Sequence, residues 1–161
     1  MIKKFNLLFL TLFNIGKIKN APGTAASLIT CLLFLLLINI FNISIIFLFT
    51  LAIFAYSFVA INNSFDEFSS SDPQEIVIDE FVGQMLPLLA IPIYETLYLL
   101  PKMYYCIPAF LLFRLFDIWK PYPVSYVDKN VNGAIGIMLD DIFAGIYTII
   151  SLVIIFFFLG A

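Results

Sequence analysis

Apolar and polar segments alternate along the chain on a length scale that predicts membrane helices. Residues 24–61 are almost wholly apolar apart from an interruption at 39–44, and this length suits two helices joined by a tight turn. Residues 62–75 are polar and contain turn residues and a proline, so we expect a loop in water there. The apolar run 5–13 is too short to cross a bilayer, and we expect it to form an interfacial or half-inserted helix.

The second half of the chain contains three more apolar segments. Residues 76–100 carry Pro87 and Pro92, which should kink or break a helix. Residues 104–119 lie between prolines, and the last segment runs from about 136 to 159. The pattern therefore predicts an all-α fold, a polytopic helical membrane protein with four to five helices, some of them broken by proline.

Composition supports a membrane protein and excludes several kinds of chemistry. The chain is 63% hydrophobic and 12% charged, too little polar surface to cover a soluble fold, and its 161 residues suit one membrane-embedded domain, 1–161. Without histidine, an enzyme here must work with carboxylates rather than with Ser-His-Asp or Cys-His systems. The basic residues form no run that would suggest nucleic acid as a partner.

The charges also predict an orientation in the membrane. Lys3, Lys4, Lys17 and Lys19 precede the first full span, which places the amino terminus on the cytoplasmic side. Counting crossings from there puts seven of the eight basic residues and every acidic residue except Glu95 on the same side. We therefore expect a multi-pass membrane protein whose acidic residues, with any site that they form, face the cytoplasm.

Acidic residues stand in pairs at what we expect to be the starts of two apolar helices. The pairs are Asp79-Glu80 and Asp140-Asp141. Gly83 lies four residues after Asp79, and Gly145 lies four residues after Asp141. Residues four apart share a helix face, and glycine lets a neighbouring helix approach, so the two pairs should meet across a small gap. Stabilisation of a helix start would explain one pair alone. The repetition favours a divalent cation such as Mg²⁺, Mn²⁺ or Ca²⁺.

Cationic residues accompany these acids. Arg114, Asp117 and Lys120 lie near one face of a predicted helix. They could form an Arg114–Asp117 pair with Lys120 reaching for the membrane surface, or Arg114 and Lys120 could bind an anion. A metal with two cations implies a multiply charged anionic substrate.

Two loops carry weaker signals. Ala-Pro-Gly-Thr at 21–24 could be only a helix cap, or its backbone N–H groups could face the same site. The segment 128–136 contains two glycines, which fit a flexible loop and a loop passing near a ligand equally well.

Four ordered segments together resemble bacterial phosphatidylglycerophosphatase A. They are Ala-Pro-Gly-Thr at 21–24, Ile-Val-Ile-Asp-Glu-Phe-Val-Gly at 76–83, Phe-Arg-Leu-Phe-Asp-Ile-Trp-Lys-Pro at 113–121 and Gly-Ile-Met-Leu-Asp-Asp at 136–141. The resemblance implies a Mg²⁺-dependent membrane enzyme that converts phosphatidylglycerophosphate to phosphatidylglycerol and inorganic phosphate. One departure is Ala134, where the resemblance leads us to expect a second glycine beside Gly133.

The resemblance also implies roles for individual residues. The expected magnesium ligands are Asp79, Glu80, Asp117, Asp140 and Asp141, and the expected catalytic residues are Asp79, Glu80, Asp117, Asp141 and Lys120. The expected substrate-binding residues are Gly23, Thr24, Arg114, Lys120 and Lys129. Water attack is the expected mechanism, an aspartyl-phosphate intermediate stays open, and so does assembly into a homo-oligomer.

Two other functions are weighed against this one. Carboxylates in apolar helices also occur in ion or proton transport proteins, but here they gather at one membrane face. Alcohol phosphatidyltransferases also bind metal through aspartates, but their Asp-Gly-x2-Ala-Arg stretch is missing. A purely structural membrane protein would leave the matching acidic pairs unexplained.

Overall fold

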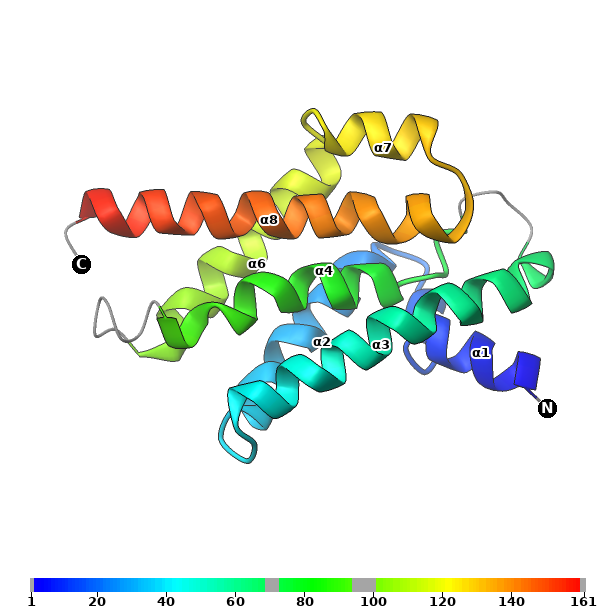
Figure 1. The fold of residues 1–161 in the computed structure, drawn as a ribbon, viewed down its shortest axis with the longest axis horizontal. Helices are drawn as coiled ribbons and strands as arrows, with labels where there is room; N and C mark the ends of the chain where they lie inside the picture. Colours follow the sequence, from blue (N-terminus) through cyan, green and yellow to red (C-terminus); the bar gives the residue numbers. More distant parts are fainter. Residues whose placement is uncertain (1, 69–72, 94–100, 160–161) are drawn as a thin grey trace.

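The computed structural model describes residues 2–68, 73–93 and 101–159, and this part of the chain is helical, as predicted (Figure 1). Its seven α-helices exceed the four to five expected: α1 Ile2–Leu10, α2 Pro22–Leu37, α3 Ile43–Ser64, α4 Ile78–Leu89, α6 Lys102–Trp119, α7 Val124–Asn130 and α8 Gly133–Leu159. Short 3-10 turns at Ile15–Lys17 and Phe65–Glu67 follow α1 and α3. Asp72 and Glu95 lie outside the described residues.

The predicted pair of helices joined by a tight turn is present as α2 and α3, but the two helices diverge and pack on other helices rather than on each other as in a hairpin. Asn42 caps α3 because its side chain accepts a hydrogen bond from the Ser44 N–H at 3.0 Å. The helix runs to Ser64, so the polar stretch from residue 62 begins inside it rather than as a loop. Ser64 is fully buried and accepts a hydrogen bond from Asn6 of α1, which gives this polar end of α3 a packing partner.

The predicted break in segment 76–100 is also confirmed, since α4 ends at Leu89 and contains Pro87. Proline has no N–H, so Pro87 cannot bond the carbonyl of Gly83 one turn earlier. That carbonyl lies instead against α8, where a Cβ built on Gly145 would be 2.6 Å from it. The carbonyl that Pro87 leaves without its hydrogen bond within the helix therefore lies where α4 and α8 are in close contact.

The last helix starts earlier than predicted. It begins at Gly133, so Asp140 and Asp141 lie about two turns inside α8 and not at its start. Gly133 has a φ of +72°, a conformation that glycine adopts without strain, and it turns the chain from α7 directly into α8. The short helix α7 was not predicted; its Val124 and Val127 are buried.

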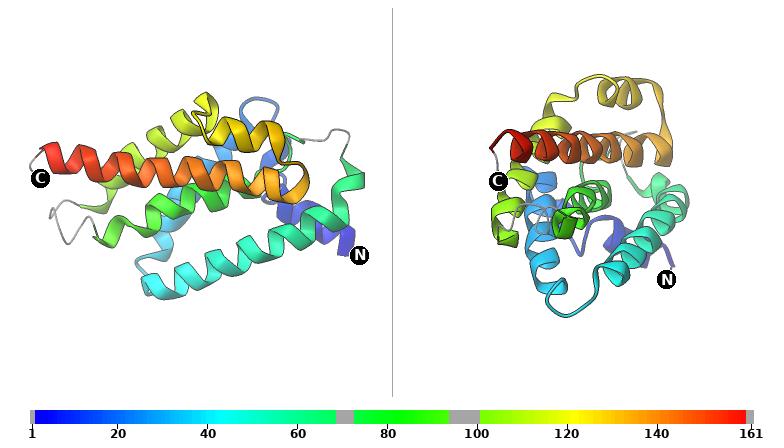
Figure 2. Two further views of the ribbon diagram at one scale, coloured as in Figure 1. Left: turned by 45° about the horizontal axis from the view of Figure 1, so that its top comes forward. Right: turned by 60° about the vertical axis from the view of Figure 1, so that its left-hand side comes forward.

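Helix α4 is the centre of the molecule. It contacts α2, α3, α6 and α8, and eight of its twelve residues are buried. The two views of Figure 2 show α8 running along α4, with α2 and α3 on the other side. Side chains near the start of α4 are therefore surrounded by protein.

The outer surface is apolar. Leu28, Leu32 and Leu36 form an exposed stripe at four-residue spacing on α2, and α3, α6 and α8 expose further large apolar side chains. Two helical stretches in the described residues, Ile43–Glu67 and Gly133–Phe158, are long and apolar enough to cross a membrane. Such a surface is compatible with a membrane protein, because soluble proteins rarely expose large apolar patches.

Candidate metal and phosphate site

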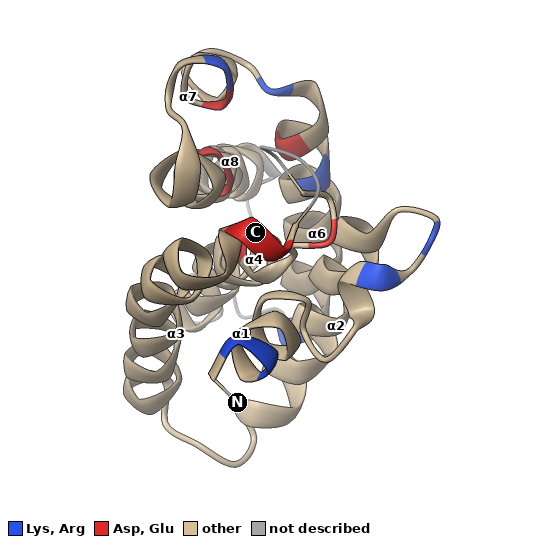
Figure 3. Cartoon of the chain, turned by 90° about the vertical axis from the view of Figure 1, so that its right-hand side faces the viewer, with Lys and Arg blue, Asp and Glu red and all other residues tan. Residues whose placement is uncertain are grey.

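The start of α4 places two acids in the interior. Ile76, Val77 and Ile78 are buried, and the Val77 N–H donates to the carbonyl of Leu10 at 3.0 Å, which fixes the chain entering α4 against α1. Asp79 and Glu80 follow in the first turn, as predicted. Figure 3 shows the acidic segments of α4, α6 and α8 close together.

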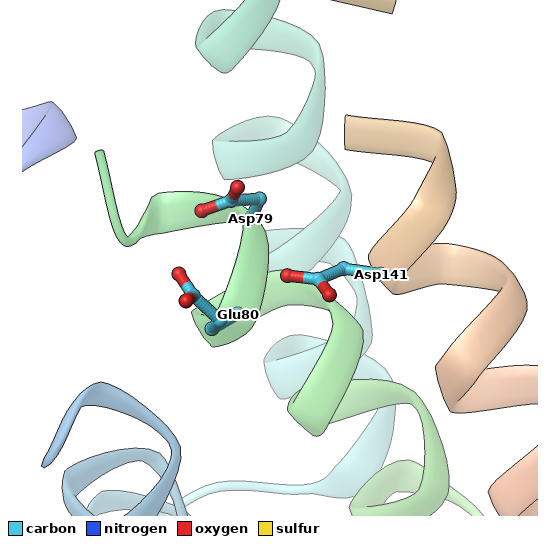
Figure 4. A group of neighbouring side chains, drawn as sticks. All are labelled: Asp79, Glu80 and Asp141. Carbon is cyan, nitrogen blue, oxygen red and sulfur yellow. The ribbon is translucent and has the colours of Figure 1, made fainter. Parts of the chain in front are cut away.

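Asp79, Glu80 and Asp141 form what we call the carboxylate cluster (Figure 4). One carboxylate oxygen of each residue lies within 4.8 Å of those of the other two. Asp141 is only 3% exposed, and Asp79 Oδ1 and Glu80 Oε2 are buried without a hydrogen-bond partner among the described residues. Carboxylates packed this closely repel one another, and hard oxygen donors suit Mg²⁺, Mn²⁺ or Ca²⁺. The cluster therefore fits a divalent cation.

Two glycines bring the helices of the cluster together, as predicted. A Cβ added at Gly83 would lie 2.7 Å from the carbonyl oxygen of Asp141 and 2.9 Å from its Cβ. A Cβ added at Gly145 would meet the backbone of Gly83. Any larger residue at either position would separate α4 from α8 and so Asp79 from Asp141.

Arg114 joins α6 to the cluster. Its Nη1 lies 2.5 Å from Asp117 Oδ2 and 3.9 Å from Glu80 Oε1. The predicted pair with Asp117 is therefore present, and it is shielded, since both side chains are about 15% exposed or less. Arg114 Nε is buried and has no hydrogen-bond partner in the part of the chain that the structure describes, which leaves a donor for an anion.

Lys120 is held in place by carboxylates of α7 and α8. It ends α6 in a left-handed conformation, with φ of 48°, and its Nζ bonds Asp128 of α7 and, at 3.0 Å, Asp140 of α8. The side chain thus reaches these carboxylates rather than the membrane surface. Burial lowers the pKa of Lys120, but the hydrogen bonds and charges of Asp128 and Asp140 outweigh burial and raise it above its ordinary value. Lys120 therefore stays protonated at neutral pH.

These groups line a single cavity of about 390 Å³, a size typical of ligand sites. Its walls include the five acids expected to bind metal: Asp79, Glu80, Asp117, Asp140 and Asp141. Arg114, Lys120 and Gly23 also line it. Residues from α2, α4, α6 and α8 therefore meet around one space.

Ala21, Pro22 and Gly23 of the 21–24 motif all line the cavity, and Gly23 lies directly against Glu80. A Cβ there would overlap Glu80 Oε1 and lie 3.1 Å from Arg114 Nη1, so only glycine fits beside this pair. The other two expected substrate-binding residues lie outside the lining: Thr24 is half-buried in the first turn of α2, and Lys129 is exposed on α7.

Sequence reasoning missed three contributors. Lys19 lines the cavity but was used only to predict orientation. Asp128 was assigned only to a loop, yet it bonds Lys120. Gln74, an exposed residue of the segment before α4, also lines the cavity. Lys19 stands two residues before the Ala-Pro-Gly-Thr motif, and this proximity was the available signal.

A family model and two of three known relatives carry the same family name. A family model described as phosphatidylglycerophosphatase A matches residues 8–156. A Haemophilus influenzae protein of that name is 36% identical over 138 residues, 86% of this chain and 80% of the relative. A Bacteroides thetaiotaomicron protein named "putative phosphatidylinositol-3-phosphatase" is 34% identical over 137 residues, 83% of this chain and 82% of the relative.

A third relative matches a shorter stretch. An Escherichia coli protein named phosphatidylglycerophosphatase A is 40% identical over 75 residues, which make up 47% of this chain and 40% of the relative. No solved structure matches the chain.

Proposed function

Since the chain belongs to the phosphatidylglycerophosphatase A family, we propose that the cavity between α2, α4, α6 and α8 is its active site. The protein is a lipid phosphatase of phosphatidylglycerol synthesis. It hydrolyses phosphatidylglycerophosphate to phosphatidylglycerol and inorganic phosphate. The observation that carries the assignment of the site is the carboxylate cluster, whose acids come from two of the segments that resemble the family.

Magnesium is the cofactor in this proposal. Asp79, Glu80 and Asp141 would hold it, with Asp117 and Asp140 on the same cavity wall. When bound, Mg²⁺ would polarise a phosphoryl oxygen and lower the pKa of a bound water molecule. The preference for Mg²⁺ rests on the family and on the all-oxygen donor set, which suits a hard cation.

Arg114 and Lys120 receive the terminal phosphate. This phosphomonoester carries close to two negative charges at neutral pH, and both side chains are cations on the cavity wall. Arg114 retains a buried donor at Nε, and Lys120 offers an ammonium group with a raised pKa. They would offset the charge on the phosphoryl oxygens as the phosphorus–oxygen bond to glycerol breaks.

Hydrolysis proceeds by direct attack of water on phosphorus in our proposal. The oxygen of water bonds to phosphorus, the ester oxygen leaves with the glycerol group, and a proton restores the glycerol hydroxyl. Asp79, Glu80 and Asp141 are the carboxylates near enough to hold the nucleophile in place. Asp117 holds Arg114 in place, and Arg114 and Lys120 position the phosphate from the side of α6.

The membrane arrangement is part of the same proposal. We place the protein in the bacterial inner membrane as a multi-pass protein, with the cavity opening toward the cytoplasm. The apolar outer faces of α2, α3, α6 and α8 support contact with lipid, and the lysines before α2 support the orientation. A lipid substrate could then keep its acyl chains in the bilayer while its headgroup enters the cavity.

Phosphate release by purified protein in neutral detergent tests this function. We expect release from phosphatidylglycerophosphate with Mg²⁺, none with excess chelator, and recovery when Mg²⁺ is restored. Phosphatidylinositol 3-phosphate is the comparison substrate, because one relative is named for that activity. Faster release from that lipid, or release that persists in chelator, would contradict the proposal.

A further inference from the structure

The cavity contains one cation that its carboxylates do not hold. Of the cationic side chains that line it in the described structure, Arg114 is paired with Asp117 and Lys120 with Asp128 and Asp140. Lys19 is exposed and has no ion pair or side-chain hydrogen bond within the described residues. Among the described residues, nothing therefore occupies its ammonium group, which can bind a ligand.

The backbone fixes Lys19 at the mouth of the cavity. The loop carrying it packs against the segment before α4, since a Cβ on Gly16 would overlap the carbonyl of Glu75. Two residues after Lys19, Ala21 begins α2 in a left-handed conformation, and Gly23 then touches Glu80. Lys19 is thus tied on both sides to the walls of the cavity while its side chain stays in solvent.

The charges divide the cavity into two parts. The inner part contains the carboxylate cluster with Arg114 and Lys120, which suits a metal-bound phosphomonoester. The lining residues that are exposed are Lys19, Ala21 and Gln74, which we call the mouth of the cavity, and within the described residues no acid pairs with Lys19 there. A second, singly charged anion attached to the monoester would find its counterion at this mouth.

We propose that Lys19 binds the phosphodiester of a lipid whose phosphomonoester lies at the carboxylate cluster. Lys19 then selects lipids in which a polyol joins two phosphates, and it disfavours phosphatidic acid, whose only phosphate is the monoester. This inference rests on the proposed function and adds the residue that recognises the second phosphate. Because the diester does not react, Lys19 acts on binding and not on the chemical step.

The test compares Lys19→Gln with Lys17→Gln. Lys17 is another exposed lysine, two residues away, that does not line the cavity, so it controls for general attraction of anionic lipid. KM and kcat are measured for phosphatidylglycerophosphate in neutral detergent micelles with Mg²⁺. Phosphatidic acid is added as a competing lipid, which gives its inhibition constant whether or not it is hydrolysed.

We expect Lys19→Gln to raise KM about fivefold to tenfold, the effect of one charge-assisted contact at a partly exposed site, with kcat within twofold of wild type. The inhibition constant of phosphatidic acid should stay within twofold of its value for the wild-type protein. Lys19→Arg should retain most of the wild-type KM, and Lys17→Gln should change neither constant.

Two results would overturn the inference while leaving the proposed function intact. One is an unchanged KM in Lys19→Gln, and the other is an equal rise in KM and in the phosphatidic acid constant. A wild-type protein that releases no phosphate from phosphatidylglycerophosphate would overturn the proposed function and this inference with it.

Discussion

Two polar clusters lie inside this apolar chain, and they differ in whether their buried atoms have partners. In the first, which we call the α1–α3 cluster, Asn6 donates to Ser64 Oγ at 3.1 Å and accepts from the Tyr56 hydroxyl at 2.8 Å. In the carboxylate cluster, Asp79 Oδ1 and Glu80 Oε2 have no hydrogen-bond partner in the described structure. Both clusters are buried, but only in the α1–α3 cluster do these buried polar atoms have hydrogen-bond partners among the described residues.

The difference separates structure from function. A buried polar group with its hydrogen bonds made costs little, whereas buried charges of one sign destabilise a fold unless something offsets them. The α1–α3 cluster joins two helices and needs nothing further. The carboxylate cluster is complete only with a cation, so it should stabilise the protein when metal is bound and destabilise it when metal is absent.

The largest effect should come from Asp141→Asn. We expect phosphate release to fall by more than about a hundredfold, since loss of even an outer partner of a metal ligand costs roughly 10- to 100-fold. In chelator the same variant should melt at a higher temperature than wild type, because one repelling charge is gone. If Asp141→Asn melts below wild type in chelator, repulsion among the carboxylates does not destabilise the metal-free protein.

Gly145→Ala should have the next largest effect, because its Cβ would meet the Gly83 backbone and push α8 from α4. Overpacking of this kind costs about 1–3 kcal/mol of stability. Activity should fall about tenfold or more, since small displacements of catalytic groups are costly. Ala52→Leu, at an exposed position of α3, is the control. Equal activity in both variants would show that the helix spacing does not matter.

Tyr56→Phe tests the α1–α3 cluster. It removes the donor to Asn6 Oδ1, and the free energy of unfolding should fall by about 1–2 kcal/mol. Activity per folded molecule should remain at the wild-type value, because Tyr56 does not line the cavity. Loss of activity without loss of stability would mean that the two clusters are coupled.

Lys3→Gln should have the smallest effect. Lys3 Nζ bonds Glu67 at 3.0 Å across α1 and the end of α3, but both side chains are largely exposed. Surface ion pairs contribute little because water and salt screen them. Thermal melting of the variant should match that of wild type at moderate salt, and a clear decrease would place this pair within the α1–α3 cluster.

The sequence predicted those features that depend on local pattern. The apolar stretch with one polar interruption predicted two helices and the turn between them, which are α2 and α3, and the paired acids with Gly83 and Gly145 predicted the approach of α4 to α8. In each case the signal lies in residues that are near in sequence or repeat a spacing. Such patterns predict neighbours in the structure because helix periodicity determines which side chains share a face.

Features that depend on tertiary contacts were not predicted. Helix α7 has only seven residues and follows two prolines, so its pattern did not distinguish it from a loop. The early start of α8 depends on the turn at Gly133. Lys19 is a single lysine among several near the amino terminus, and only the packing of Gly16 and Gly23 reveals that it lines the cavity.

The central claim is that the carboxylate cluster holds a divalent cation, and Mn²⁺ binding followed by electron paramagnetic resonance tests it most directly. Wild-type protein in detergent should remove the signal of free Mn²⁺, and Mg²⁺ should restore it by competition. Asp79→Asn and Asp141→Asn should each bind at least about tenfold more weakly, as expected for loss of a ligand. Asp66→Asn, an exposed acid outside the cavity, should bind as wild type does. Wild-type affinity in the folded Asp79 and Asp141 variants would contradict the claim.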